Sequence, residues 1–255
     1  DKAPAGLHAF ERVGSASAER AIYDGRFPGF LCACAEALNS PDPITVSAAS
    51  AELFDEARVV ATDEARAAAL WDRLMRRVGT GAMRTILEAF LSDRPGADAA
   101  AALALRRLRE EGARALDDLS DPAVLEVAKA STRSRREAHL LCGLARLSEL
   151  SDGSWYGAIE PSCDVLILMA DHFAARFGPL RFALQDARRG TALVHEPGQA
   201  CVLVAFLELP PGGPPLSAAE HETRRLWKRY FQAVSIAERT NRSLQRGHMP
   251  KRYWS

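Results

Sequence analysis

The sequence predicts a single compact α+β domain. Hydrophobic residues make up 47% of the 255 residues, so the chain can bury a full core. Apolar residues recur at helical spacing between residues 63 and 150, whereas short apolar runs separated by turn residues follow Asp152 and Gly153. We therefore expect a helical N-terminal and middle part, a small mainly antiparallel sheet, and a C-terminal helix.

The N-terminal part begins with a change in composition. Residues 1–20 are small and polar enough to form a loose leader, so we expect the domain to occupy residues 21–255. Residues 23–30 predict a short strand and a turn that enters a helix. The elements expected next are this helix over 29–38 and two short strands around 44–47 and 57–61.

The middle of the chain makes residues 21–150 rich in helix. Glycine and proline residues separate three segments in which apolar residues recur at helical spacing. A proline near the beginning of such a segment is typical of a helix start. The expected elements are a helical hairpin over 63–91, an alanine-rich helix over 97–116, and a long helix from Pro122 to about Leu150.

Residues 151–210 are expected to contain the sheet, because β-branched and aromatic residues alternate there with turns. The expected strands are 155–160, 181–186, 192–195 and 201–207, with a helix over 166–177 inserted between the first two.

The C-terminal segment, residues 216–255, begins with a capping box in which Ser217 precedes Glu220 by three residues. The helix that it opens carries one apolar side, which we expect to be a buried stripe: Leu226, Trp227, Tyr230, Phe231 and Val234.

Charge is balanced over the chain but not along it. The charges of the 33 basic and 33 acidic residues cancel, yet the segment from Glu222 to Ser255 contains nine Lys or Arg and only two acidic residues. A local excess of this kind is typical of a polyanion-binding surface.

Several protein classes are disfavoured by what the sequence lacks. The five cysteines are odd in number and have no framework spacing, and no long apolar run or secretion signal is present, so we expect a cytoplasmic protein without membrane contact. No complete catalytic motif, metal-ligand pattern or cofactor loop is found, so we predict neither a metal nor a cofactor. Whether the protein is an enzyme stays open.

Three groups of polar residues are candidates for a site. Arg135, His139, Cys142 and Arg146 recur at helical spacing, so they form either a phosphate-binding or acid-base row or a solvated helix face. Glu160 ends a strand, and His172 and Arg176 lie one helical turn apart. These residues suit either a hydrolytic or phosphate-handling site or a structural ion-pair cluster. Asp186 and Arg188 lie in a turn, where arginines either contact phosphate or serve only solubility.

The C-terminal tail also leaves two interpretations open. Its aromatic side chains either pack in the core or stack on bases beside the arginines, with Tyr230 and Phe231 expected in the core in both cases. Asn241 and Gln245, an i, i+4 amide pair, either contact base edges or cap backbone groups.

With these residues in view, the chain resembles the DUF4130 family from Tyr23 to Trp254. The resemblance rests on these segments: Tyr23-Asp24-Gly25, Gly29-Phe30-Leu31, Glu137-Ala138-His139, Glu160-Pro161, His172-Phe173, Arg176-Phe177, Leu226-Trp227-Lys228 and Arg252-Tyr253-Trp254. Members are labelled probable DNA metabolism proteins and sit beside a radical SAM protein. The same domain is also found fused to uracil-DNA glycosylase-like modules. The resemblance therefore implies a DNA-repair setting, DNA as a ligand and a radical SAM partner.

We accordingly expect a DNA-binding protein that acts with that partner. The alternatives are an adaptor that docks on the partner without touching DNA, and a free-standing DNA-processing hydrolase. The expected nucleic-acid contacts are Arg146, Arg176, Arg188, Arg239, Asn241, Gln245 and Arg252. If the protein is catalytic, the expected acid-base residues are His139, Glu160, His172 and Asp186.

Overall fold

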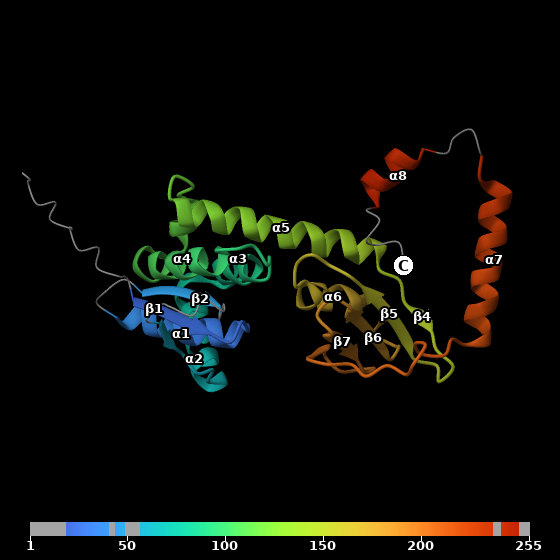
Figure 1. Ribbon diagram of the computed structural model, residues 1–255, viewed down its shortest axis with the longest axis horizontal. Coiled ribbons are helices and arrows are strands. Elements are labelled where there is room, and N and C mark those ends of the chain that lie inside the picture. Colours follow the sequence, from blue (N-terminus) through green and yellow to red (C-terminus); the bar gives the residue numbers. More distant parts are fainter. Residues whose placement is uncertain (1–18, 41–43, 49–56, 237–240, 250–255) are drawn as a thin grey trace, which may run out of the picture. The chain divides into compact units, whose positions relative to one another are not determined.

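The computed structural model describes residues 19–40, 44–48, 57–236 and 241–249 (Figure 1). Its mixture of helices and sheets confirms the predicted α+β class. The chain forms two compact units, Asp1–Arg73 and Leu74–Ser255, rather than the one domain that we expected.

The first unit is built on a three-stranded sheet. Its elements are β1 (Glu19–Tyr23), α1 (Phe27–Asn39), β2 (Ile44–Ala48), β3 (Ala57–Val59) and the first part of α2 (Glu64–Val78). The strands run parallel in the order β2-β1-β3, and α1 supplies the crossover that a parallel β1-β2 pair requires. The predicted leader was too long by two residues, because Glu19 and Arg20 belong to β1. Residues 1–18 lie outside the described part.

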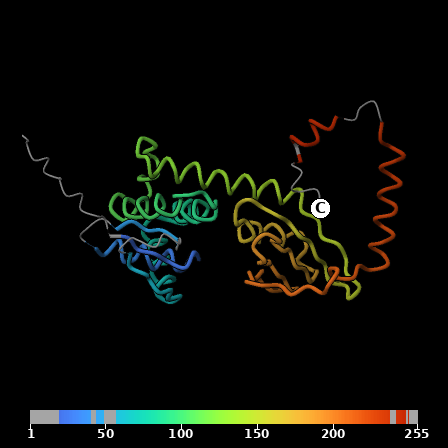
Figure 2. Tube along the Cα trace, viewed as in Figure 1, coloured from blue at the N-terminus to red at the C-terminus, as the bar shows by residue number. Residues whose placement is uncertain are grey.

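The second unit starts with helices. They are α3 (Thr80–Phe90), α4 (Ala97–Glu111), a 3-10 turn η1 (Ala113–Asp117) and α5 (Pro122–Leu144). Figure 2 traces α5 as one uninterrupted helix, and α3 and α4 both pack against it. Asp121 caps its start by accepting the backbone N–H groups of Ala123 and Val124 at 2.8 and 3.0 Å.

The long helix ends six residues earlier than the approximate end at Leu150 that we predicted, so that boundary was wrong. Ala145 is extended, and Ser148 and Glu149 form strand β4, which pairs with β5. Gly157 in β5 allows this close return, because a Cβ there would overlap the carbonyl oxygen of Arg146. Pairing with a distant strand therefore takes precedence over local helix propensity.

The sheet of this unit has five strands in chain order. They are β4 (Ser148–Glu149), β5 (Trp155–Ile159), β6 (Phe182–Asp186), β7 (Ala192–His195) and β8 (Val202–Val204). All neighbours are antiparallel except β5 and β6, which are joined through α6 (Leu166–Phe177). The inserted helix and the first three predicted strands are confirmed, whereas the last strand, predicted over 201–207, covers only Val202–Val204. Phe173 of α6 packs with Phe182 and other buried apolar residues of the sheet in one core.

The C-terminal helices are α7 (Ala218–Val234) and α8 (Arg242–His248). As predicted, Ser217 caps α7, since its hydroxyl oxygen accepts the Glu220 N–H at 2.9 Å. The same hydroxyl donates to the Glu149 carboxylate at 2.8 Å, which ties the start of α7 to β4.

The predicted buried stripe on α7 is wrong. No residue of α7 is buried, and the exposed fractions of Trp227, Tyr230 and Phe231 are 61%, 58% and 58%. The helix is amphipathic as expected, but none of the described elements covers its apolar side. None of the described helices is both long enough and apolar enough to cross a membrane.

Candidate functional site

A groove of about 520 Å³ lies between helices of the second unit. Its charged and titratable lining comes in pairs from three helices: Arg84 and Glu88 from α3, Arg135 and His139 from α5, and His172 and Arg176 from α6. Cys142, Ala138, Gly143 and Leu168 complete the lining.

Helical spacing brings these pairs into the groove. Arg135, His139 and Cys142 lie on one side of α5, while Ala138 and Leu141 of the same helix are buried. On α6, burial of Phe173 leaves His172 and Arg176 exposed. The predicted row on α5 therefore lines the groove, apart from Arg146, which lies beyond the end of the helix and is exposed.

Glu88 neutralises two of the groove's arginines. Its side chain is 2% exposed and accepts from the Arg84 Nε at 2.9 Å and from the Arg135 Nε and terminal nitrogen at 3.1 and 2.9 Å. Its backbone oxygen also accepts the Ser134 hydroxyl at 2.5 Å, which links α3 to α5. Charge-assisted bonds to a buried carboxylate are strong, so Arg84 and Arg135 are held in place.

Arg176 differs from these two arginines. Among the described residues, no carboxylate pairs with it, and its guanidinium lies 5.5 Å from the centroid of the Phe177 ring. An uncommitted guanidinium beside two imidazoles and two further arginines is suited to an incoming anion.

The groove offers neither an activated thiol nor a metal cage. Burial raises the pKa of the Cys142 thiol, so the thiol stays protonated and weakly nucleophilic at neutral pH. In the part of the chain that the structure describes, no three His, Cys, Asp or Glu side chains gather as metal ligands.

Asp186 holds a turn and is not among the groove's lining residues. Its carboxylate is fully buried, accepts the backbone N–H groups of Arg188 and Arg189 at 2.9 and 3.1 Å, and pairs with the Arg189 guanidinium at 2.6 Å. Arg189 also binds Asp93 and donates to the carbonyl oxygens of Pro161 and Ser162. This geometry explains Asp186 as a structural anchor.

The remaining predicted residues are scattered. Glu160 and Arg188 are exposed and do not line the groove, and Arg188 donates to the Ser162 oxygen at 3.4 Å. The side chain of Asn241 caps α8 by accepting the Leu244 N–H at 2.9 Å, which agrees with the backbone-capping interpretation. Gln245 is exposed in the same helix. Arg239 and Arg252 fall outside the described residues. The groove thus brings together His139, His172 and Arg176 from the predicted set.

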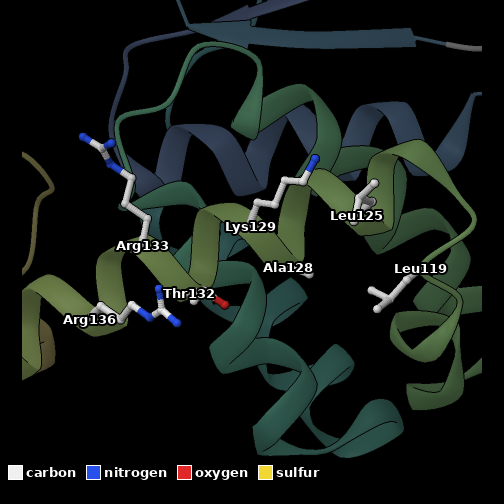
Figure 3. Close-up of a pocket in the computed structure, with 7 residues that line it drawn as sticks. All are labelled: Leu119, Leu125, Ala128, Lys129, Thr132, Arg133 and Arg136. Carbon is white, nitrogen blue, oxygen red and sulfur yellow. The ribbon is translucent and has the colours of Figure 1, made fainter.

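A second hollow, of about 390 Å³, is lined mainly by residues of α5 that do not line the groove (Figure 3). Three cations line it, Lys129, Arg133 and Arg136, with Thr132 among them and Leu119 and Leu125 at one end (Figure 3). None of the three pairs with a carboxylate among the described residues. This cluster was not among the predicted site residues, although the i, i+4, i+7 spacing of its cations is a signal in the sequence. Arg84 and Glu88 were not predicted either.

Asp164, in the loop between β5 and α6, makes the stability of the fold depend on pH. Its pKa is raised by burial and by the nearby Asp186 and Asp93 carboxylates, although Arg189 opposes the shift. An acid with a raised folded-state pKa stabilises the fold fully only below its unfolded pKa, and this contribution is lost as the pH rises through the folded value. Asp164→Asn is therefore expected to increase the free energy of unfolding at pH 7, with a gain that shrinks towards pH 4. Urea unfolding at both pH values checks this.

The matched control is Asp152→Asn, because hydrogen bonds from Ser154 lower the Asp152 pKa. This substitution is expected to reduce stability at pH 7, the opposite sign. Equal effects of the two substitutions would contradict the assignment.

The fold and the groove together define an α+β protein with a basic, histidine-containing groove. Residues 95–255 match DUF4130, described as a domain of unknown function; the match covers more than half of the chain, and the protein belongs to this family. This match confirms the family that the sequence resembles over residues 95–255, whereas the resemblance expected from Tyr23 onward is not matched before residue 95. No curated protein and no solved structure matches the chain.

Proposed function

We propose that this protein binds DNA by holding a backbone phosphate in the groove between α5 and α6. The observation that carries the proposal is Arg176, which has no carboxylate partner among the described residues and lines the groove together with His139, His172 and two arginines that Glu88 holds in place. Guanidinium groups bind phosphate, as they bind carboxylates, with two parallel hydrogen bonds.

The second hollow on α5 supports an extended contact. Its cluster, Lys129, Arg133 and Arg136, shares α5 with the groove residue His139. At 1.5 Å per residue, the ten residues from Lys129 to His139 span about 15 Å. Successive phosphates of one strand advance by about 3.4 Å along the axis of a duplex, so a stretch of this length laid along that axis spans roughly four of them.

The proposal includes a DNA-repair setting and a radical SAM partner enzyme in the cytoplasm. Family membership supports this part through the association that the sequence resemblance implies. The protein would present DNA to the partner, which would carry the iron-sulfur cluster for which this chain shows no motif.

Fluorescence anisotropy with single- and double-stranded DNA across a salt series tests the proposal. Removal of one phosphate contact lowers affinity by about five- to eightfold at 0.1 M salt and reduces the salt slope by about one. Arg176→Gln is expected to show both effects. Arg181→Gln is the matched control, since Arg181 is exposed, pairs with Glu196 at 2.8 Å and does not line the groove.

Glu88→Gln should act in the opposite direction. The substitution keeps the shape of the side chain but releases Arg84 and Arg135 from a carboxylate, so the groove gains positive charge. We expect DNA to bind more tightly and with a steeper salt slope. Absence of binding at 50 mM salt, or binding that ignores both Arg176 and Glu88, would refute the proposed function.

The groove also gives the hydrolase alternative a specific test. His139 and His172 are the predicted acid-base residues that line it. Cleavage of damaged DNA by the protein alone, lost on His139→Gln and His172→Gln substitution while DNA binding persists, would assign catalysis to this site.

A further inference from the structure

The apolar side of α7 is the largest group of exposed hydrophobic side chains on one element of the second unit. Its members, which we call the α7 stripe, are Leu226, Trp227, Tyr230, Phe231, Val234 and the following Ile236, and each is 49–61% exposed. The rings of Trp227 and Tyr230 lie 5.8 Å apart between centroids, and the helical members follow one another at i, i+3 and i+4 spacing. Contiguous exposed apolar surface of this kind marks an interaction site.

The helix is anchored at its beginning. Ser217 binds Glu149, and the guanidinium of Arg224 donates to the Ser148 hydroxyl at 2.8 Å and to Glu220 at 2.8 Å. These contacts all lie at the N-cap and in the first two turns of the helix. The stripe begins after them and has no buried residue.

Cations border the stripe on both edges. At 100° per residue, the helical members from Leu226 to Val234 cover roughly 140°, with Arg229 beyond one edge and Lys228 beyond the other. Neither Lys228 nor Arg229 pairs with a carboxylate among the described residues. The complementary surface is therefore apolar at its centre and acidic at its rim.

We propose that α7 docks, through this stripe, into an apolar groove with an acidic rim on a partner protein. An amphipathic helix with anchors at i, i+4 and i+8 is a common form of helix-in-groove recognition. The inference does not rest on DNA binding, which uses α5 and α6.

Two other occupants fit less well. Nucleic acid stacks on aromatic rings, but half of the stripe is aliphatic, namely Leu226, Val234 and Ile236, and these gain only by burial in an apolar surface. A second copy of the chain would place Lys228 and Arg229 of one stripe against the same cations of the other. Like charges that face each other across an interface are unfavourable.

Calcium-loaded calmodulin serves as a probe, because it presents a methionine-rich apolar groove to basic amphipathic helices. We expect the full-length protein to bind this probe in isothermal titration calorimetry, and removal of calcium to abolish the binding. Trp227→Ala and Phe231→Ala should each weaken it by roughly 30-fold or more, as central aromatic anchors do. Lys228→Gln with Arg229→Gln should weaken it less and reduce its salt dependence.

The control is Gln232→Ala, on the polar side of α7, which should leave the affinity unchanged. All of these positions are exposed, so the variants are expected to fold, and circular dichroism verifies this. Absence of probe binding, or binding that survives both aromatic substitutions, would overturn the proposal. So would a dimer seen by light scattering, or binding to anionic vesicles, that the aromatic substitutions abolish. Loss of probe binding with intact DNA binding would overturn this inference alone.

Discussion

Arg189→Met is expected to lower the free energy of unfolding by about 3–5 kcal/mol. Asp186, the carboxylate that Arg189 neutralises, has no exposed surface, so the substitution leaves a buried charge without its partner. Arg189 also binds Asp93 and the carbonyl oxygens of Pro161 and Ser162, which joins the loop after α3 to the loop after β5. Urea unfolding followed by circular dichroism measures the effect.

The neighbouring arginine provides the control. Arg188 is exposed and makes one long hydrogen bond from its side chain, so Arg188→Met should change stability by no more than about 0.5 kcal/mol. The double variant Asp186→Asn, Arg189→Met removes both charges and keeps an acceptor for the turn, so it should be more stable than Arg189→Met alone. If Arg189→Met unfolds at the same urea concentration as the wild type, the anchoring role of this ion pair is wrong.

Neutralising the cations of α5 and α6 that lack a carboxylate partner should have the largest effect on DNA binding. In a variant with Lys129, Arg133, Arg136 and Arg176 replaced by Gln, we expect about a thousandfold loss of affinity at 0.1 M salt, because four phosphate contacts each contribute about five- to eightfold. The slope of log affinity against log salt should become less steep by about three to four.

This outcome is informative because the variant keeps the ion pairs of Glu88 and Arg189, so the fold should be retained. A variant with Arg66, Arg94, Arg181 and Arg225 replaced by Gln removes the same amount of charge from residues that already pair with carboxylates. If the two variants bind DNA equally, net charge rather than this surface governs binding. If the slope of log affinity against log salt is unchanged in the first variant, DNA contacts other residues.

Much of the secondary structure follows from local signals. The helix over 166–177 and the strand over 192–195 have the predicted boundaries, and Ser217 and Asp121 begin helices as their capping chemistry requires. Each of these signals acts within a few residues, so neighbouring sequence is sufficient to reveal it. The end of α5 could not be found in this way, because strand β4 exists only through its pairing with β5.

The candidate site was only partly accessible from the sequence. The spacing on α5 and α6 predicted which side chains share a helix face and singled out His139, His172 and Arg176, and the family resemblance includes the same three residues. The role of Glu88 depends on α3 packing against α5, nearly fifty residues further along the chain. Asp186 was taken as an acid-base candidate, whereas the structure gives it Arg189 as a partner and complete burial.

The sequence by itself determined that this protein is α+β, that α7 is amphipathic, and that its basic residues gather at helical spacing, because periodicity, caps and turns are local properties of the chain. The tertiary structure alone decided that the α7 stripe is exposed and that Arg176 is uncommitted while Arg84 and Arg135 are paired. Burial and charge pairing depend on which distant segments meet, and those contacts form only when the chain has folded.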